Sequence, residues 1–314
     1  MPSLYLINPH SDYPAYYGAE VFRDLGLAPA AFMADLAVTT VAALAPVDFQ
    51  VEICEESVAP ARLDCEADFI GITGKVSQRN RMLELAREYK RRGRRVILGG
   101  PYASLSPESL RPHCDILLRG ELEPVAERLF RDLRSGDYQS EYQGSAADLA
   151  DTPLPRWDLY PNDRALQGSI QTGRGCPFRC DFCDTIQYVG RHQRHKPPQR
   201  VLQELEVLYR LGYRSVFLAD DNLTAHKTRA RQLLTALAEW NESASSGRVH
   251  FSTQISLDAG GRPALLELCA RAGLSEAFVG IETPNIDSLR ASHKPQNLLD
   301  DPVRSVERFV EQGV

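Results

Sequence analysis

Short runs of hydrophobic residues alternate along the chain with longer segments in which apolar positions recur every three or four residues. In the first half, five runs are almost continuously apolar, which is typical of strands in a sheet covered on both faces. They lie at residues 4–9, 49–56, 68–73, 95–100 and 115–120. The segments between them predict helices at about 29–45, 77–92, 104–111 and 121–135. Strands that alternate with helices in this way predict an α/β fold with a doubly wound, Rossmann-like parallel sheet.

Small residues collect where these strands are expected to end, and open parallel sheets bind ligands beyond the carboxyl ends of their strands. The segments are TGKVSQ at 73–78, GGPYAS at 99–104 and GELEP at 120–124. Glycine lets the backbone approach a ligand closely, although a tight turn requires it just as often. A ligand site and a simple turn therefore both stay open for each loop taken alone.

The pattern changes between the two halves of the chain. Residues 151–161 contain three prolines and two large aromatic residues, which predicts a linker packed on a domain surface. From residue 168 the alternation resumes, and this predicts a second α/β domain that resembles part of a (β/α) barrel. The expected strands are 168–175, 215–222, 249–256 and 276–283, and the expected helices are 198–211, 226–243, 263–273 and 300–313. We therefore expect a first domain at 1–140, a linker at 141–167 and a second domain at 168–314.

The composition excludes several classes of protein. A net charge of -6 and a pI near 5.7 argue against a nucleic-acid surface, which would track phosphates with basic residues. The basic run at 191–196 is local, and both a solvated loop face and a place near an anionic ligand stay open for it. The most apolar stretch, residues 27–47, contains Asp35 and two threonines and is bounded by prolines. We expect it to be a buried helix and not a membrane span.

The location of the protein is suggested by its N-terminus and its cysteines. The first ten residues carry no cationic region of the kind that begins a secretory signal. Four scattered cysteines lie in or beside apolar runs, as buried unreactive thiols do: Cys54, Cys65, Cys114 and Cys269. Both observations fit a reducing, cytoplasmic environment.

The other three cysteines, Cys176, Cys180 and Cys183, form the motif C-x3-C-x2-C within GRGCPFRCDFCD. Structural zinc takes four protein ligands, so this spacing would need His192 or His195 as a fourth. A redox pair formed by Cys180 and Cys183 would leave Cys176 unexplained. The spacing suits an iron-sulfur cluster with one open iron better than either alternative.

This motif, with Phe182 just before the last cysteine and with its place after the first strand of the second domain, resembles the signature of radical S-adenosylmethionine (radical SAM) enzymes. The resemblance implies that Cys176, Cys180 and Cys183 bind a 4Fe-4S cluster whose fourth iron binds S-adenosylmethionine. It further implies that an electron from the cluster cleaves S-adenosylmethionine to a 5'-deoxyadenosyl radical, which abstracts a hydrogen atom.

Further motifs resemble one branch of this superfamily. The first half is similar to a cobalamin-binding domain, on the strength of Pro29 to Leu36, Gly99-Gly100-Pro101 and Gly120-Glu121-Leu122-Glu123. In the second half, LADDN at 218–222, GIETPN at 280–285 and KPQN at 294–297 look like the branch that includes the hopanoid C-methylating enzymes.

The resemblance also implies which side chains contact the cofactors. Contacts to S-adenosylmethionine are implied for Phe182, Asp220, Asp221, Asn222, Gln254 and Glu282. Contacts to cobalamin are implied for Thr73, Gly74, Ser77, Gln78, Gly99, Gly100, Pro101, Gly120 and Glu121. As alternatives, Asp221 or Asn222 caps the next helix, and Glu282 forms an ion pair with a lysine. Cobalamin proteins that place a histidine on cobalt carry D-x-H-x-x-G, whereas this loop reads NPHSDYP, so His10 is interpreted as a loop residue.

The function implied is a cobalamin-dependent radical SAM methyltransferase that acts on an unactivated carbon through a 5'-deoxyadenosyl radical and methylcobalamin. We expect a small-molecule or lipid substrate and an external electron donor of the flavodoxin or ferredoxin type. The alternatives are a non-methylating enzyme that rearranges or cyclises its substrate, and a cobalamin and iron-sulfur binding module without turnover. The family core has six βα units, whereas this chain reaches Val314 after four, so a truncated protein or a fragment is expected.

Overall fold

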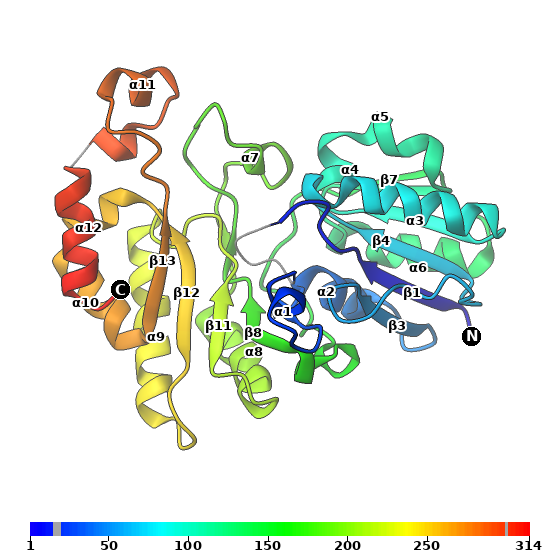
Figure 1. Cartoon of the computed structure of the whole chain (residues 1–314), viewed down its shortest axis with the longest axis horizontal. Coiled ribbons are helices and arrows are strands. Elements are labelled where there is room, and N and C mark those ends of the chain that lie inside the picture. Colours follow the sequence, from blue (N-terminus) through cyan, green and yellow to red (C-terminus); the bar gives the residue numbers. More distant parts are fainter. Residues whose placement is uncertain (15–19, 299–300) are drawn as a thin grey trace. The chain divides into compact units, whose positions relative to one another are not determined.

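A computed structural model describes residues 1–14, 20–298 and 301–314, and its chain divides into two compact units (Figure 1). Unit 1 comprises Met1–Ala147 and Asp151–Leu166. Unit 2 comprises Asp148–Ala150 and Gln167–Val314.

Unit 1 is built on a six-stranded sheet in the order β3-β1-β4-β5-β6-β7, and all of its neighbouring strands are parallel. The strands are β1 (Ser3–Asn8), β3 (Gln50–Glu55), β4 (Phe69–Thr73), β5 (Arg95–Gly99), β6 (Ile116–Arg119) and β7 (Glu141–Gln143). The five strands predicted from the apolar runs are confirmed within one or two residues at each end. The doubly wound parallel fold is confirmed with them.

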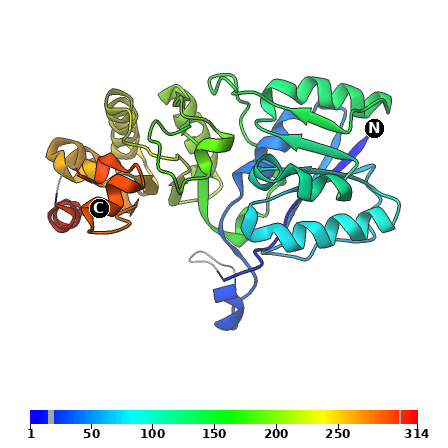
Figure 2. The ribbon, with the colours of Figure 1, turned by 90° about the horizontal axis from the view of Figure 1, so that it is seen from above.

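Helices cover both faces of this sheet, which explains why its strands are apolar without interruption (Figure 2). Successive side chains of a strand point to opposite faces. On β1, Tyr5 and Ile7 pack in the cluster formed with α3 (Arg79–Arg91), α4 (Pro101–Leu105) and α5 (Pro107–Leu110). Leu4 and Leu6 face a pocket on the other side, which α2 (Leu36–Leu44) and α6 (Ala126–Ser135) also line.

Two of the predicted helices in unit 1 are corrected by the structure. The helix expected from residue 29 begins only at Leu36. Asp35 caps it there by accepting a hydrogen bond of 2.9 Å from Val38 N. Residues before the cap, Ala31–Met33, form the short strand β2. The helix expected at 104–111 is instead two short helices, α4 and α5, which meet at Ser106. Proline disfavours helical backbone in the residue before it, and Pro107 follows Ser106 directly.

The segment between the two alternating patterns contributes to unit 1. β7 adds a sixth strand in parallel beside β6, which the sequence pattern did not indicate because the strand has only three residues. Further along, Trp157 and Tyr160 are almost fully buried, and their rings meet edge to face with centroids 5.8 Å apart. These two aromatic residues therefore anchor the segment 151–166 to unit 1.

Unit 2 contains the greater part of β8 (Ala165–Ile170) and the whole of β11 (Ser215–Leu218), β12 (His250–Ile255) and β13 (Leu274–Val279). These four strands are parallel and pair in that order. A long helix follows each strand: α8 (Pro198–Arg210), α9 (Lys227–Ser243), α10 (Pro263–Ala272) and α12 (Pro302–Glu311). The four expected βα units are thus present. The smaller helices are α1 (Glu20–Asp24) in unit 1 and α7 (Thr185–Tyr188) and α11 (Ile286–Ala291) in unit 2.

The apolar stretch at 27–47 contains β2 and the nine-residue helix α2. Among the described residues, none of the helices combines the length and the apolar character needed to cross a membrane.

Candidate functional site

The cysteine motif lies in a loop that a two-stranded antiparallel ribbon holds at its base. The ribbon pairs β9 (Gly173–Arg174) with β10 (Arg194–His195). Gly175 follows β9 with φ of 98°, and a Cβ atom there would lie 2.6 Å from the carbonyl oxygen of His192. Only glycine fits this close approach of the two arms. Cys176 N then donates a hydrogen bond of 3.3 Å to Gly190 O, which closes the loop.

The three cysteines of this loop share one neighbourhood. Their thiols are free, and Cys180 is the most buried of the three. Cys183 N donates a hydrogen bond of 3.0 Å to Cys180 O. Burial raises the pKa of Cys176 to about 11, and negative charge on Asp221, Cys183 and Cys180 acts in the same direction. Among the described residues, no three Cys, His, Asp or Glu side chains converge on a point that could hold a single metal ion.

Two neighbouring carboxylates at the end of β11 hold the backbone that leads into the cysteine loop. Asp220 is buried and accepts three hydrogen bonds: 2.7 Å from Thr172 N, 2.6 Å from Thr172 Oγ1 and 2.9 Å from Gly173 N. Burial nevertheless raises the pKa of Asp220 to about 6. Asp221 accepts a hydrogen bond of 2.7 Å from Gly175 N. Both side chains therefore position the loop from the neighbouring strand.

Helix capping, the alternative considered for Asp221 and Asn222, is not what the structure shows. α9 begins at Lys227, and its N-cap is His226, whose side chain accepts a hydrogen bond from Arg229 N. Asn222 is buried and donates from Nδ2 to Ser256 Oγ. Gln254, on the next strand, is exposed, and its backbone carbonyl accepts a hydrogen bond of 3.0 Å from Leu223 N.

Glu282 lies just beyond β13 and does form the ion pair with a lysine that was considered for it. Its partner is Lys294, whose Nζ also donates a hydrogen bond of 2.8 Å to Gly280 O. Glu282 has φ of 64°, a left-handed conformation that is unusual for a residue other than glycine and costs of the order of 1–3 kcal/mol. Lys294 Nζ is also 5.5 Å from the ring centroid of Phe182, which is 56% exposed.

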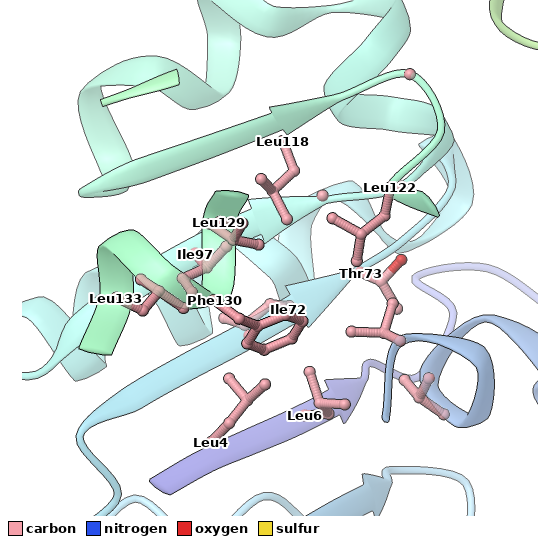
Figure 3. Close-up of a pocket in the computed structure, with 16 residues that line it drawn as sticks. Leu4, Leu6, Ile72, Thr73, Ile97, Leu118, Leu122, Leu129, Phe130 and Leu133 are labelled. Atoms are coloured by element: carbon pink, nitrogen blue, oxygen red, sulfur yellow. The ribbon is translucent and has the colours of Figure 1, made fainter. Parts of the chain in front are cut away.

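A pocket lies on the second face of the sheet of unit 1 and encloses about 620 Å³, counting the part open to solvent (Figure 3). Its walls are mainly aliphatic. They come from β1, β4, β5 and β6 and from α2 and α6, and Figure 3 shows Leu118 and Leu122 across the pocket from Leu4 and Leu6, with Phe130 between them. Glycine occupies two strand positions that face the pocket, Gly71 and Gly99. The sheet therefore leaves room where larger side chains would fill the core.

Four of the residues expected to contact cobalamin line this pocket: Thr73, Gly99, Gly100 and Gly120. Gly100 has φ of 90°, and a Cβ atom there would lie 2.6 Å from Thr73 Oγ1 and 2.9 Å from Gly74 N. The loop after β4 and the loop after β5 therefore touch directly, and this contact requires glycine at position 100.

The other five expected residues lie outside the pocket lining: Gly74, Ser77, Gln78, Pro101 and Glu121. Gln78 connects the loop after β4 to the end of β1, because its Nε2 donates hydrogen bonds of 2.9 Å to Asn8 Oδ1 and 2.5 Å to Pro9 O. Glu121 is buried and accepts a hydrogen bond of 3.0 Å from Ala147 N. Pro101 begins α4, and Gly74 O accepts from Tyr102 N.

The apolar walls of the pocket could not be predicted from the sequence, because a continuously apolar strand looks the same whether its side chains meet a helix or line a cavity. A buried carboxyl group at the end of β3 was not predicted either. Glu55 accepts hydrogen bonds of 2.7 Å from Asn8 Nδ2 and 3.0 Å from the Tyr160 hydroxyl. Burial, with the negative charge of Asp35, raises the pKa of Glu55 to about 7. His10, in the loop after β1, is exposed.

Comparisons with known proteins agree with this arrangement. Residues 170–314 match the Radical SAM superfamily. An uncharacterized methyltransferase of Synechocystis is 33% identical over 285 residues, which are 89% of this chain and 53% of the relative. The hopanoid C-2 methylase of Rhodopseudomonas palustris is 31% identical over 293 residues, which are 91% of this chain and 55% of the relative. This chain thus spans about half the length of the curated relatives it matches.

A solved structure shares the fold of the whole chain. It is the radical S-adenosylmethionine methyltransferase TsrM from Kitasatospora setae, with cobalamin and a [4Fe-4S] cluster bound. Its TM-score is 0.75 at 16% identity, and the match covers 100% of this chain and 66% of TsrM. The three-cysteine loop, the fold and these matches together identify the chain as a member of the radical SAM superfamily.

Proposed function

We propose that this chain carries the cofactor-binding part of a cobalamin-dependent radical SAM methyltransferase that acts on an unactivated carbon. The observation that carries the proposal is the loop with Cys176, Cys180 and Cys183, which Asp220 and Asp221 hold at the strand ends of unit 2. The names of the two relatives, both methylating enzymes, support the choice of reaction.

The donor set of the cysteine loop fits a 4Fe-4S cluster better than a lone metal ion. It offers three free thiols, whereas a structural zinc ion takes four protein ligands. A cluster with three thiolate ligands keeps one iron open for S-adenosylmethionine. When bound, the cluster supplies the electron that cleaves S-adenosylmethionine, and cobalamin carries the methyl group.

The pocket of unit 1 fits the apolar part of a corrinoid cofactor. Its walls are mostly aliphatic, as the walls of small-molecule sites are. Gly99, Gly100 and Gly120 line it at the carboxyl ends of β5 and β6, where they let the backbone approach a ligand. We propose that Thr73 to Gln78 cover one face of the cobalamin and that His10 does not bind cobalt, since its loop lacks the aspartate and the glycine of D-x-H-x-x-G.

The residues that we expect to contact S-adenosylmethionine would serve it in different ways. The exposed ring of Phe182 is available to the adenine, and the Glu282 carboxylate, which Lys294 fixes, is available to a ribose hydroxyl. Asn222 and Gln254 lie at the ends of β11 and β12, where parallel strands bind ligands. Asp220 and Asp221 would act by holding the loop, because their carboxylates already accept its backbone amides.

We further propose a small-molecule or lipid substrate and an external electron donor of the flavodoxin or ferredoxin type. The seven free cysteines suit a reducing compartment such as the cytoplasm.

The binding part of the proposal is tested on the full chain, purified and reconstituted without oxygen. Iron and sulfide analysis should show close to four of each per chain, and Cys180→Ala should abolish the cluster. Leu118→Trp should fill the pocket and lower cobalamin binding at least tenfold, because the indole occupies the space between the sheet and α6. Leu154→Trp, at an exposed position of unit 1, is the matched control and should bind cobalamin normally.

The reaction is tested by the products formed under reduction. S-adenosylhomocysteine together with 5'-deoxyadenosine and a methylated product would support a methyltransferase. Formation of 5'-deoxyadenosine without methyl transfer would point to a non-methylating enzyme. A chain that binds both cofactors and forms neither product would be a binding module.

A further inference from the structure

The segment Lys294–Asn297, with the sequence KPQN, is anchored to the end of β13. Asn297 Nδ2 donates hydrogen bonds of 2.8 Å to Gly280 O and 2.9 Å to Ile281 O. Lys294 donates to Gly280 O and pairs with Glu282. Lys294, Gln296 and Asn297 are all buried, although two of them are amides and one is a cation. This KPQN segment is therefore fixed on the sheet of unit 2.

The same region of the chain also contacts the cysteine loop. Asp181 N donates a hydrogen bond of 3.1 Å to Ser292 O, and His293 Nδ1 lies 2.9 Å from Asp181 Oδ2. Gln296 Nε2 donates a hydrogen bond of 3.4 Å to Cys180 Sγ. Residues more than one hundred positions apart are thereby joined at the middle cysteine of the motif.

The contact between Gln296 and Cys180 is shielded from water. Gln296 is 6% exposed and Cys180 is 9% exposed. Gln296 Oε1 is buried and has no hydrogen-bond partner among the described residues. A buried amide oxygen without a partner costs free energy, and the bond to Cys180 Sγ is the hydrogen bond that the side chain gains in return. Its amide hydrogen is aimed at a sulfur atom, which accepts hydrogen bonds best as a thiolate.

We propose that Gln296 is a positioning residue that raises the reduction potential of the cluster bound at Cys180. The inference rests on the proposed function, because it requires Cys180 to be a cluster ligand. Reduction adds negative charge to the cluster, part of which resides on the cysteine sulfurs. An N–H donor stabilises that charge, and hydrogen bonds to the sulfurs are among the features that set cluster potentials. Gln296 thereby makes it easier for the electron donor to reduce the cluster.

The test is a redox titration of the reconstituted full chain, followed by the electron paramagnetic resonance signal of the reduced cluster. Gln296→Leu removes the donor at similar volume. At a fixed solution potential near the wild-type midpoint, we expect the ratio of reduced to oxidised cluster to fall about tenfold. For a one-electron couple this corresponds to a midpoint about 59 mV lower.

Gln167→Leu is a matched control in the same unit. Gln167 is also buried, its Nε2 donates to Ser215 Oγ at 2.9 Å and Ser252 Oγ at 2.8 Å, and its Oε1 also has no partner among the described residues. Its loss should destabilise the unit without moving the potential. An unchanged potential in Gln296→Leu, or an equal change in both variants, would overturn the proposal.

Failure of the inference and failure of the proposed function give different results. If the wild-type chain assembles no cluster, the proposed function fails. If the wild type assembles a cluster and Gln296→Leu does not, the contact with Cys180 is tested in the cluster-free chains. The rate at which iodoacetamide alkylates Cys180 is then measured by mass spectrometry. A rate several-fold higher than in Gln167→Leu would support the contact, and an equal rate would refute it.

Discussion

The backbone amide of Gly175 donates a hydrogen bond of 2.7 Å to the carboxylate of Asp221. This bond ties the residue before Cys176 to the end of β11, 46 positions along the chain. Together with the bonds to Asp220, it means that a neighbouring strand holds the start of the cysteine loop. The pairing of β8 with β11 therefore supports the start of the loop.

Asp220→Asn should loosen this attachment. The Asp220 carboxylate accepts from three donors through two charged oxygens, whereas an asparagine amide has one neutral oxygen and turns its NH2 group toward Thr172 Oγ1. We expect a loss of about 2 kcal/mol in the free energy of unfolding, the cost of removing hydrogen bonds to a buried charged group. Cluster content after reconstitution should fall several-fold. Asp287→Asn, at a side chain that is 90% exposed, should change stability by less than about 0.5 kcal/mol. Equal cluster content in the two variants would contradict this role.

Glu55 should make the stability of the protein depend on pH. Its pKa is raised from 4.5 to about 7, so between these values the folded chain binds a proton that the unfolded chain has lost. The free energy of unfolding therefore falls as pH rises through this window, by up to about 1.4 kcal/mol per pH unit and about 3 kcal/mol in all.

Urea unfolding from about pH 4 to about pH 8 tests this, with Glu55→Gln as the variant that cannot titrate. As pH rises, the unfolding free energy of the wild type should fall relative to that of Glu55→Gln. Glu108→Gln, whose side chain is 82% exposed, should follow the wild type. Parallel curves for wild type and Glu55→Gln would show that Glu55 titrates normally.

Gly100→Ala should disturb the contact between two loops at the pocket. The substitution places an alanine in a left-handed backbone conformation. It also introduces a clash, since the new Cβ atom would lie 2.6 Å from Thr73 Oγ1. We expect a loss of roughly 3 kcal/mol, against about 1 kcal/mol for Gly93→Ala. Gly93 has φ of 75°, but a Cβ atom there would meet nothing within 4 Å. Thermal melting of both variants measures the difference, which is the contribution of the clash. Equal losses of stability in Gly100→Ala and Gly93→Ala would mean that the loop after β4 moves away and relieves the clash.

The ion pair between Lys196 and Glu204 should behave as a buried pair. The Nζ to Oε1 distance is 2.5 Å, and the two side chains are 4% and 0% exposed. Lys196→Met or Glu204→Leu alone leaves an unpaired buried group, so each should cost about 3–5 kcal/mol. The double variant should regain most of that loss, because it leaves no charge behind. A double-mutant cycle by chemical denaturation gives the coupling free energy between the two side chains. Losses that simply add in the double variant would contradict this prediction.

The sequence predicted the strands well because a sheet covered on both faces requires unbroken apolar runs. It predicted the start of α2 poorly, since the helix begins where Asp35 can cap it and not where apolar residues begin. The cysteine loop was recognisable because its three cysteines lie within eight residues. Gln296 and Glu55 were not, because their roles depend on partners such as Cys180 and Tyr160 that lie about one hundred residues away. Hydrogen bonds across such separations leave no periodic pattern.

The pocket beneath Leu118 and Leu122 has a thermodynamic consequence. A cavity with aliphatic walls lacks part of the packing energy that a filled core would supply. Any molecule that fills this cavity binds the folded chain but not the unfolded one. Bound at one hundred times its dissociation constant, such a molecule adds about 2.7 kcal/mol to the stability of the fold. The melting temperature of unit 1 is thus a direct gauge of how far this pocket is occupied.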